Sequence, residues 1–499
     1  MKILTKMIYR VFLLLGGISV LTACYEDKGN YNYKDIGSVT VKVEEEQALQ
    51  RIMMGNNIQI TPVYSLDKVD KKDLTFTWDI VLEGEDTPTY KVLSNEEVLD
   101  VPLVEAPGKY SLRLGIRNEV TGVTSYGYYL VEVTTALTRS FLLLCEVGEG
   151  MYDIEAAPDL PTIGIVVHNL YSSINGEYLK GAKKIVYKNN FLKYEDFLWI
   201  IQEQGGQSLS TVDLTYHGDA TTWFFEAPSP IVPLTILGDA MGMTYYMVVN
   251  GSLYYINNLS TPFKAGMPVL TRDQQEYNIT GVATVINASK YEDYAFWDQK
   301  GKRFLHWQST TKTLETMETV AGAFDPNDVG DMTPFFMGDG VKDRSYNFMK
   351  DASGKVHMFV FKNSSASYNK VVAEPYRHVV LDDKFEFEKA TAICPSRRLE
   401  VIYYAVGNII YLFDPLLNER RIVYEDSDKE MRFVKLYYKD NYDNRVIAAG
   451  NSGDKGYFYR IYLNSAGDIM APTEERPLPW DQLGPYPKIV DMEYKYKAY

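Results

Sequence analysis

The residues that could carry out acid–base or metal chemistry do not form a catalytic pattern in this sequence. The histidines are spread without ligand spacing, at His168, His217, His306, His357 and His378. The chain has no H-E-x-x-H metal motif, no G-x-S-x-G nucleophile turn and no glycine-rich phosphate loop. We therefore predict no catalytic residue, no metal ligand and no cofactor. Carboxylate pairs for glycoside hydrolysis stay open, because distant segments of a fold can bring them together.

An acidic loop and two aromatic clusters are further candidates for binding. Residues 325–331, D-P-N-D-V-G-D, space their carboxylates as a calcium loop would, but lack the glutamate that completes an EF-hand. A plain surface loop is therefore the favoured interpretation. Trp223-Phe224-Phe225 and Trp480 could stack on sugar rings or peptide side chains, although packing between structural units is favoured. The ligand-binding residues stay unassigned.

Cys24 is the residue whose surroundings assign it a definite chemistry. Three basic residues precede a short apolar run, and the small residue Ala23 lies directly before Cys24. The ending L-T-A-C resembles the bacterial lipobox, which implies that residues 1–23 are a signal peptide and that Cys24 carries lipid. An ordinary signal peptide with an incidental cysteine is the alternative. The run is shorter than the ~20 residues of a membrane-spanning helix, and two glycines interrupt it.

The residues after Cys24 are polar and acidic. Glu26 and Asp27 resemble the surface-export signal of Bacteroidetes lipoproteins, which implies an outer-membrane anchor that faces the cell exterior. The alternative is a solvated tether without a signal. We expect residues 24–37 to form a tether in either case.

Composition limits the remaining possibilities. With 499 residues the chain is too long for one ordinary domain core. The net charge of -15 argues against nucleic-acid binding, which requires a basic surface. Cys145 and Cys394 both lie in apolar, strand-like runs and are predicted to be buried free thiols, while a disulfide between them stays open.

Residues 38–137 have the pattern of a small β-sandwich. Apolar residues alternate in short runs, as in L-T-F-T-W-D-I around Trp78. Pro107-Gly108 begins another alternating strand, and Thr121-Gly122 forms a hairpin turn before the returning strand. About a hundred residues of short strands around a central tryptophan are typical of an immunoglobulin-like sandwich.

Residues 138–499 repeat a unit of strand, tight turn, strand and polar loop. The clearest copies are residues 245–256, with an Asn-Gly turn, and residues 401–412, with a Gly-Asn turn. Weaker copies begin near Phe141, Phe197, Tyr294, Tyr346 or Val356, and Val446. A period of about 45 to 60 residues predicts a β-propeller of about seven blades. An irregular array of β-sandwiches is the alternative.

The two ends of this repeated region complement each other. The hairpin at Phe141 lacks a strand before it, whereas residues 489–494, I-V-D-M-E-Y, resemble such a strand without a hairpin after it. We therefore predict that the C-terminal strand completes the first blade and closes the ring, which removes an open sheet edge.

Taken together, the lipobox, the acidic tether, Trp78 and G-K-Y-S-L-R-L at residues 108–114 resemble the PKD-like lipoprotein family of gut Bacteroidetes. The chain departs from the usual pattern because Asp79-Ile80 is not followed by a clear Gly-Asp-Gly turn. The resemblance implies a non-enzymatic accessory lipoprotein beside a TonB-dependent porin and its lipoprotein lid, for uptake of oligopeptides or glycans. A hydrolase with its site in the propeller channel, or a surface adhesin, remains an alternative.

Overall fold

The computed structural model describes two compact units of the chain. One unit is Met1–Leu103 with Lys109–Glu132, and the other is Val104–Gly108 with Val133–Tyr499. Within them the described residues are 37–45, 47–84, 89–135, 137–159, 168–188, 196–238, 244–257, 263–286, 292–308, 310–341, 344–367, 370–437, 445–474 and 476–495. The predicted signal peptide, Cys24, Glu26 and Asp27 lie outside the described residues.

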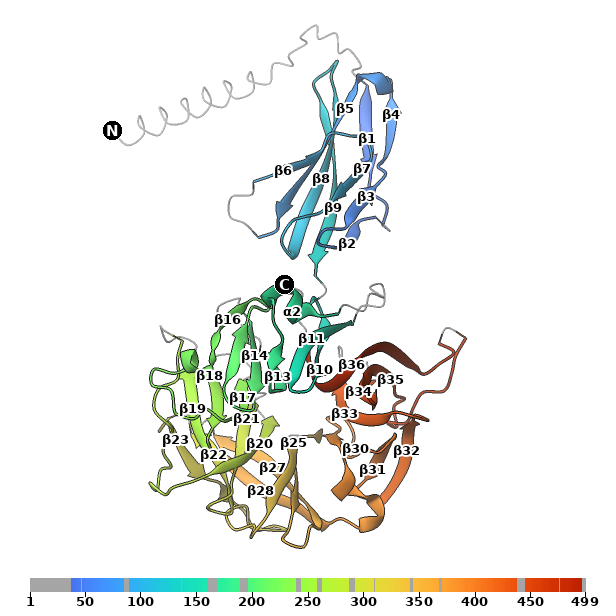
Figure 1. The fold of residues 1–499 in the computed structure, drawn as a ribbon. Helices are drawn as coiled ribbons and strands as arrows, with labels where there is room; N and C mark the ends of the chain where they lie inside the picture. The colour runs from blue at the N-terminus through green and yellow to red at the C-terminus, as the bar shows by residue number, and fades with distance from the viewer. Residues whose placement is uncertain are drawn as a thin grey trace, which may run out of the picture. The chain divides into compact units, whose positions relative to one another are not determined.

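The first unit is a β-sandwich (Figure 1). Its largest sheet has five strands in the order β2 (Leu49–Met53), β9 (Thr124–Thr134), β8 (Gly108–Asn118), β5 (Leu74–Leu82) and β6 (Lys91–Ser94). Two antiparallel pairs complete it: β1 (Ser38–Lys42) with β4 (Val63–Asp67), and β3 (Asn57–Ile60) with β7 (Leu99–Pro102). The turn η1 (Lys71–Asp73) leads into β5.

Trp78 is the centre of the sandwich core, as the sequence predicts. It is fully buried, its ring centroid lies 5.6 Å from that of Tyr129, and its Nε1 donates to the carbonyl of Glu96 at 3.1 Å. On the other side of β5, Asp79 accepts two hydrogen bonds from Arg113, of which the shorter is 2.7 Å. The alternation along β5 therefore directs a tryptophan into the core and a carboxylate to a charged partner on β8.

The second unit is a ring of sheets, and the described residues form seven blades (Figure 1). The second blade has β13 (Ala182–Lys188), β14 (Phe197–Gln202), β15 (Gly206–Leu209) and β16 (Tyr216–Asp219), and the third has β17 (Pro233–Gly238), β18 (Thr244–Val249) and β19 (Ser252–Asn257). The fourth blade has β20 (Ile279–Ile286), β21 (Glu292–Asp298), β22 (Arg303–Gln308) and β23 (Thr313–Thr316), and the sixth has β29 (Ala392–Pro395), β30 (Ile402–Val406), β31 (Ile409–Asp414) and β32 (Glu419–Glu425). The fifth blade, between these two, has β25 (Thr333–Asp339), β26 (Arg344–Lys350), β27 (Val356–Ser367) and β28 (Lys370–Val380), with β24 (Glu318–Thr319) added parallel to β28.

The first and seventh blades share one long strand, β36 (Trp480–Lys495). Its first half, residues 480–487, pairs with β35 (Lys455–Tyr462), which continues the blade of β33 (Glu430–Tyr437) and β34 (Arg445–Ser452). Its second half, residues 488–495, pairs with β10 (Ser140–Gly148), beside β11 (Met151–Pro158) and β12 (Leu179–Lys180). A seven-stranded sheet therefore runs through both blades and joins the two ends of the ring.

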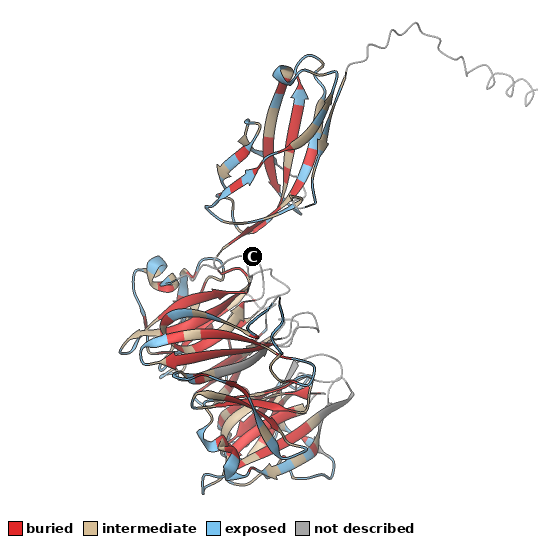
Figure 2. Cartoon of the chain, turned by 90° about the vertical axis from the view of Figure 1, so that its right-hand side faces the viewer, coloured by how far each residue is buried: buried red, intermediate tan, exposed pale blue. Residues whose placement is uncertain are grey.

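The hydrophobic core of the ring lies between neighbouring blades. Within the described residues, seven buried clusters are found, and each joins the strands of two adjacent blades. Figure 2 shows buried segments along the strands of the blades. Because alternate side chains of a strand face opposite sides of the sheet, each blade directs one set of side chains toward each of its two neighbouring blades. The prediction of an all-β fold with a sandwich and a propeller is confirmed.

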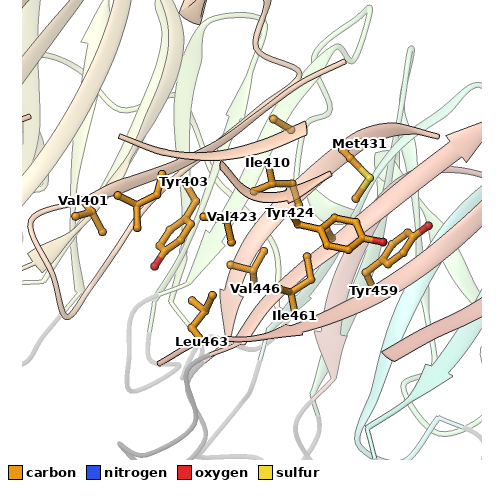
Figure 3. Close-up of a cluster of buried hydrophobic side chains, with 13 residues drawn as sticks. Val401, Tyr403, Ile410, Val423, Tyr424, Met431, Val446, Tyr459, Ile461 and Leu463 are labelled. Atoms are coloured by element: carbon orange, nitrogen blue, oxygen red, sulfur yellow. The ribbon is translucent and has the colours of Figure 1, made fainter. Parts of the chain in front are cut away.

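One of these clusters, between the sixth and seventh blades, is drawn in Figure 3. Tyr403 and Ile410 from the sixth blade meet Val446 and Tyr459 from the seventh, and all four are essentially buried. The hydroxyl of Tyr403 donates to the carbonyl of Gly467 at 2.8 Å. A tyrosine at such a position fills the core and still satisfies its polar end.

The structure contains elements that the repeat pattern does not predict. A short helix, α2 (Leu170–Asn175), lies between β11 and β12, and the buried Asp153 accepts from the backbone N–H of Tyr171 and Ser172 near its start. The other turns of 3-10 helix are η2 (Ala220–Trp223), η4 (Asp383–Phe385) and η5 (Phe387–Lys389). In the described residues Cys145 and Cys394 form no disulfide; Cys145 is buried as predicted, whereas Cys394, on the first strand of the sixth blade, is only partly buried.

Candidate functional site

A cavity of about 390 Å³ lies between the second and third blades of the propeller. The second blade contributes residues of β14, β15 and β16 and of η2, and the third contributes Met247 of β18 and Ile256 of β19. Phe263, in the segment that follows β19, completes the lining. Figure 1 labels β14 and β16 of the second blade and β18 and β19 of the neighbouring third blade.

The sequence of β14, F-L-W-I-I-Q, explains how its aromatic residues reach this cavity. Leu198 and Ile200 pack in the cluster shared with the first blade, whereas Trp199 and Ile201 pack in the cluster shared with the third. Because alternate residues of a strand face the same side, Phe197 lies on the side of Trp199. The continuous apolar run is needed because both faces of the strand are covered.

Three aromatic rings form a nearly parallel stack in the cavity wall. The ring of Phe197 lies 4.7 Å from that of Phe263 with an interplanar angle of 5°, and 5.0 Å from that of Trp199 with an angle of 12°. Tyr245, which is fully buried, contacts all three rings edge-on. Phe197 and Phe263 are only partly buried, so part of this aromatic surface is accessible.

Polar groups surround the aromatic stack, and secondary structure holds several of them in place. Ser210 accepts from the N–H of Val212 at 3.2 Å, and Thr222 donates to the carbonyl of Asp219 at 2.6 Å at the start of η2. The carboxylate of Asp196 accepts from the hydroxyl of Tyr187. These bonds fix a rim of oxygen atoms around an apolar wall.

Trp223 is the polar donor that the protein leaves unused. It is 5% exposed and lines the cavity, and its Nε1 is buried without a hydrogen-bond partner among the described residues. A buried polar group without a partner costs roughly 1–3 kcal/mol.

A second cavity, of about 800 Å³, lies where the first and seventh blades meet. Its polar centre is Glu155, whose side chain is fully buried and accepts hydrogen bonds from the N–H of Asn169 at 3.1 Å. The Nδ1 of His168 lies 2.8 Å from the same carboxylate. At the rim Lys488 pairs with Glu146 at 2.7 Å.

Burial controls the protonation of the groups beside this second cavity. Burial raises the pKa of Glu155, and the hydrogen bonds from Asn169 and His168 oppose this only in part. Burial also raises the pKa of the neighbouring Cys145 thiol, and the charges of Glu155 and Asp153 raise it further. Cys145 is therefore kept as an unreactive thiol, since the thiolate is the nucleophilic form.

The acidic segment 325–331 forms a turn. Asp325 accepts from the backbone N–H of Asn327 at 2.9 Å, and Asp331 lies 3.5 Å from Lys302. Among the described residues no group of three or more metal-binding side chains comes together. The favoured interpretation of a surface loop agrees with these bonds.

The aromatic clusters singled out in the sequence mostly pack between blades. Phe224 is 1% exposed, and Trp480 packs against Tyr424 at 5.5 Å in the cluster between the sixth and seventh blades. Phe225 is 60% exposed and does not line either cavity. Only Trp223 belongs to a cavity.

Two of the scattered histidines meet in the fold. His357 on β27 and His378 on β28 lie 3.0 Å apart, and His357 also contacts Asp351 at 3.2 Å. His306 is buried, and burial lowers its pKa.

In the part of the chain that the structure describes, no helix is long and apolar enough to cross a membrane.

One family of known proteins is similar to the N-terminal part of the chain. Residues 24–182 match the PKD-like family. This segment covers the sandwich and continues through the first strands of the propeller. No curated protein matches the chain.

Comparison with solved structures returns propeller-containing proteins of low identity. A putative 6-phosphogluconolactonase from Bacteroides uniformis is 12% identical, with 85% of this chain and 100% of that chain covered and a TM-score of 0.39. An auxiliary nutrient binding protein from Bacteroides thetaiotaomicron is 11% identical, with 83% and 95% covered and a TM-score of 0.33. A quinoprotein alcohol dehydrogenase-like protein from the same organism is 10% identical, with 86% and 95% covered and a TM-score of 0.37.

Neither cavity was predicted from the sequence. The residues of the first cavity come from segments between residues 196 and 263 whose apolar members match the strand pattern. The signal that could have found them is the clustering of Phe197, Trp199 and Trp223 in one blade, next to a loop rich in serine and threonine. Glu155 and His168 could not be paired from the sequence, because that contact is made across the turn into α2.

Proposed function

We propose that the chain is a lipid-anchored binding protein of the outer-membrane surface. In this proposal it is an accessory subunit of a TonB-dependent nutrient uptake complex and binds oligopeptides or glycans. The observation that carries the binding role is the cavity between the second and third blades, which has an aromatic wall and a few fixed polar groups. Concave sites of this composition are the usual form of small-ligand sites.

The anchor in this proposal rests on the residues before the sandwich. L-T-A-C at residues 21–24 supplies the lipidation site, and Glu26 and Asp27 supply an export signal. More than one acyl chain is needed for firm attachment, since each buried methylene contributes only ~0.8 kcal/mol. The propeller supplies a rigid scaffold whose blade interfaces are packed all around the ring.

The test uses Cys24→Ala in the full chain. We expect the unchanged protein to incorporate a labelled fatty acid, to sediment with membranes, and to co-purify with a TonB-dependent porin and its lid after mild detergent extraction. The variant should lose all three properties. Cys394→Ala is the matched control and should keep them. Labelling that persists in Cys24→Ala, or a purified complex without a porin, would contradict the proposal.

Hydrolysis of glycans or peptides is a second candidate function, and the pairing of Glu155 with His168 favours it. In the tautomer in which Nδ1 donates to Glu155, Nε2 of His168 keeps a free lone pair. Such a ring can act as a general base toward water.

If the chain is a hydrolase of this kind, Glu155→Gln should lower kcat while ligand affinity at the other cavity is kept. Unchanged turnover in this variant would exclude the pair from catalysis.

A further inference from the structure

The cavity between the second and third blades has a lining that restricts the chemical class of its ligand. Phe197 stacks on both Trp199 and Phe263 with nearly parallel planes, so these rings cover part of each other's faces and only their outer faces are left for a ligand. The face of an aromatic ring carries partial negative charge. It therefore attracts the polarised C–H groups on the face of a pyranose ring.

The charges around the cavity disfavour an anionic ligand. None of its described lining residues is lysine or arginine, His217 is its one basic side chain, and Asp196 places a carboxylate at its edge. An acidic ligand would lose hydration there without gaining a permanently charged cationic partner, which is costly. An uncharged ligand avoids that cost.

The hydrogen-bonding groups of the cavity require a ligand that both donates and accepts. The carboxylate of Asp196 only accepts, whereas the ring of His217 carries an N–H that donates. Ser210 and Thr211 can do either. Sugar hydroxyl groups have the same double capacity, so one ring can satisfy both kinds of group.

The size of the cavity agrees with a short, ring-shaped ligand. Its volume of about 390 Å³ lies near the lower end of the ~300–1,000 Å³ that small-ligand sites span. We propose that the cavity binds the uncharged end of a glycan chain, with a pyranose ring against the outer face of Phe263. This inference rests on the proposed function and narrows its ligand class from oligopeptides or glycans to neutral glycans.

The experiment measures binding to the full mature chain by calorimetry and by tryptophan fluorescence, since Trp199 and Trp223 line the site. The probes are neutral tetrasaccharides (cello-, xylo-, manno- and malto-series), tetragalacturonate as the acidic counterpart, and the peptide Ala-Phe-Ala. At least one neutral tetrasaccharide should bind, while tetragalacturonate and the peptide should bind at least tenfold more weakly. Failure of every neutral probe to bind would overturn the inference.

Three variants link binding to the cavity. Phe263→Ala should weaken binding at least tenfold, whereas Phe225→Ala, an exposed aromatic residue of the same blade outside the cavity, should leave it unchanged. Val212→Arg changes an exposed residue of the rim, so folding should be kept. The added cation should raise the affinity for tetragalacturonate relative to the neutral sugars. Equal effects of Phe263→Ala and Phe225→Ala would overturn the assignment of the site.

The outcomes separate this inference from the proposed function. Binding of the peptide that depends on Phe263 and exceeds that of every sugar would overturn the glycan class and leave the binding role in place. Loss of the porin from the purified complex would contradict the uptake role, whatever the cavity binds. Neutral-sugar binding that Phe263→Ala abolishes would support the inference.

Discussion

Asp426 illustrates how a single side chain joins two blades. It follows β32 in the sixth blade, is 6% exposed, and accepts from the hydroxyl of Tyr459 in the seventh blade at 2.8 Å. Lys429 contacts the same carboxylate at 3.1 Å. Burial alone would raise the pKa of Asp426, but hydrogen bonds from Asp428, Tyr459 and Lys429 lower it to about 2.

This arrangement predicts an acid-dependent loss of stability. The folded-state pKa of Asp426 lies below its ordinary value of 3.8, so its contribution is present above about pH 4 and is lost as the pH falls toward 2. Asp426→Asn should therefore destabilise the propeller by about 2 kcal/mol at pH 7 and by much less near pH 2. Thermal unfolding at both pH values measures this, with the exposed Asp383→Asn as control. An equal loss at both pH values would contradict the assignment.

At the residue scale, sequence reasoning succeeds where the surroundings are local. Trp78 lies in the middle of an alternating strand, and its full burial follows from that pattern. The pairing of His357 with His378 depends on the register of two strands joined by a long hairpin, which the sequence does not determine. The contact of Asp426 with Tyr459 likewise depends on how two blades pack.

At the scale of elements, β36 is the strand on which ring closure depends. Ile489 and Met492 are fully buried between the first and seventh blades, and the ring of Tyr494 lies 4.6 Å from that of Phe141. Fully burying one such apolar side chain contributes ~1.5–3 kcal/mol. Net stabilities of ~5–15 kcal/mol leave little margin for losing several of them.

Deletion of the residues after Lys488 should therefore unfold or aggregate the propeller while the sandwich stays folded. Removal of this segment also exposes the facing edge of β10, which favours association between chains. Thermal unfolding followed by circular dichroism measures the effect. A chain that ends at Lys495 keeps the whole strand and is the control. A melting temperature of the shorter chain within a few degrees of the control would show that the segment is dispensable.

The hairpins were the most predictable elements. Asn250 and Gly251 both have positive φ, of 52° and 74°, as the Asn-Gly turn between β18 and β19 requires. The helix α2 was not predicted, because six residues are too few to show helical periodicity and Asp153, which binds its first N–H groups, is distant in sequence. The first half of β36 was also missed, since its glycine and two prolines interrupt the alternation.

At the scale of the whole molecule, the repeat period in the sequence was sufficient to predict the propeller fold and the approximate number of blades. The strands of each blade are local in sequence, so their order follows the chain, except where β36 joins the ends and where β24 lies beside β28. The cavities depend on side chains from separate strands and loops, and their shapes could not be derived from the pattern of apolar residues. The candidate site was therefore predictable in its scaffold and not in its lining.

The acidic residues after Cys24 give a prediction about orientation in the membrane. If the proposed anchor and export signal hold, replacing Glu26 and Asp27 with alanine should leave the protein lipidated but facing the periplasm, because Cys24 is kept. Protease treatment of intact cells, followed by immunoblotting, distinguishes the two orientations. Replacement of Glu44 and Glu45, an acidic pair after β1, is the control. Equal digestion of both variants would show that Glu26 and Asp27 are part of a tether and not an export signal.

The partnership between β10 and β36 also sets an order of events during biosynthesis. Phe141 and Tyr494 are about 350 residues apart, so the ribosome completes the partner strand last. At a translation rate of ~5–20 residues per second, the edge of β10 stays unpaired for about 20–70 s before β36 has been synthesised. During that interval the nascent chain presents an apolar strand to solvent. Any chaperone that binds the nascent chain must therefore shield the beginning of the ring until its end has been translated.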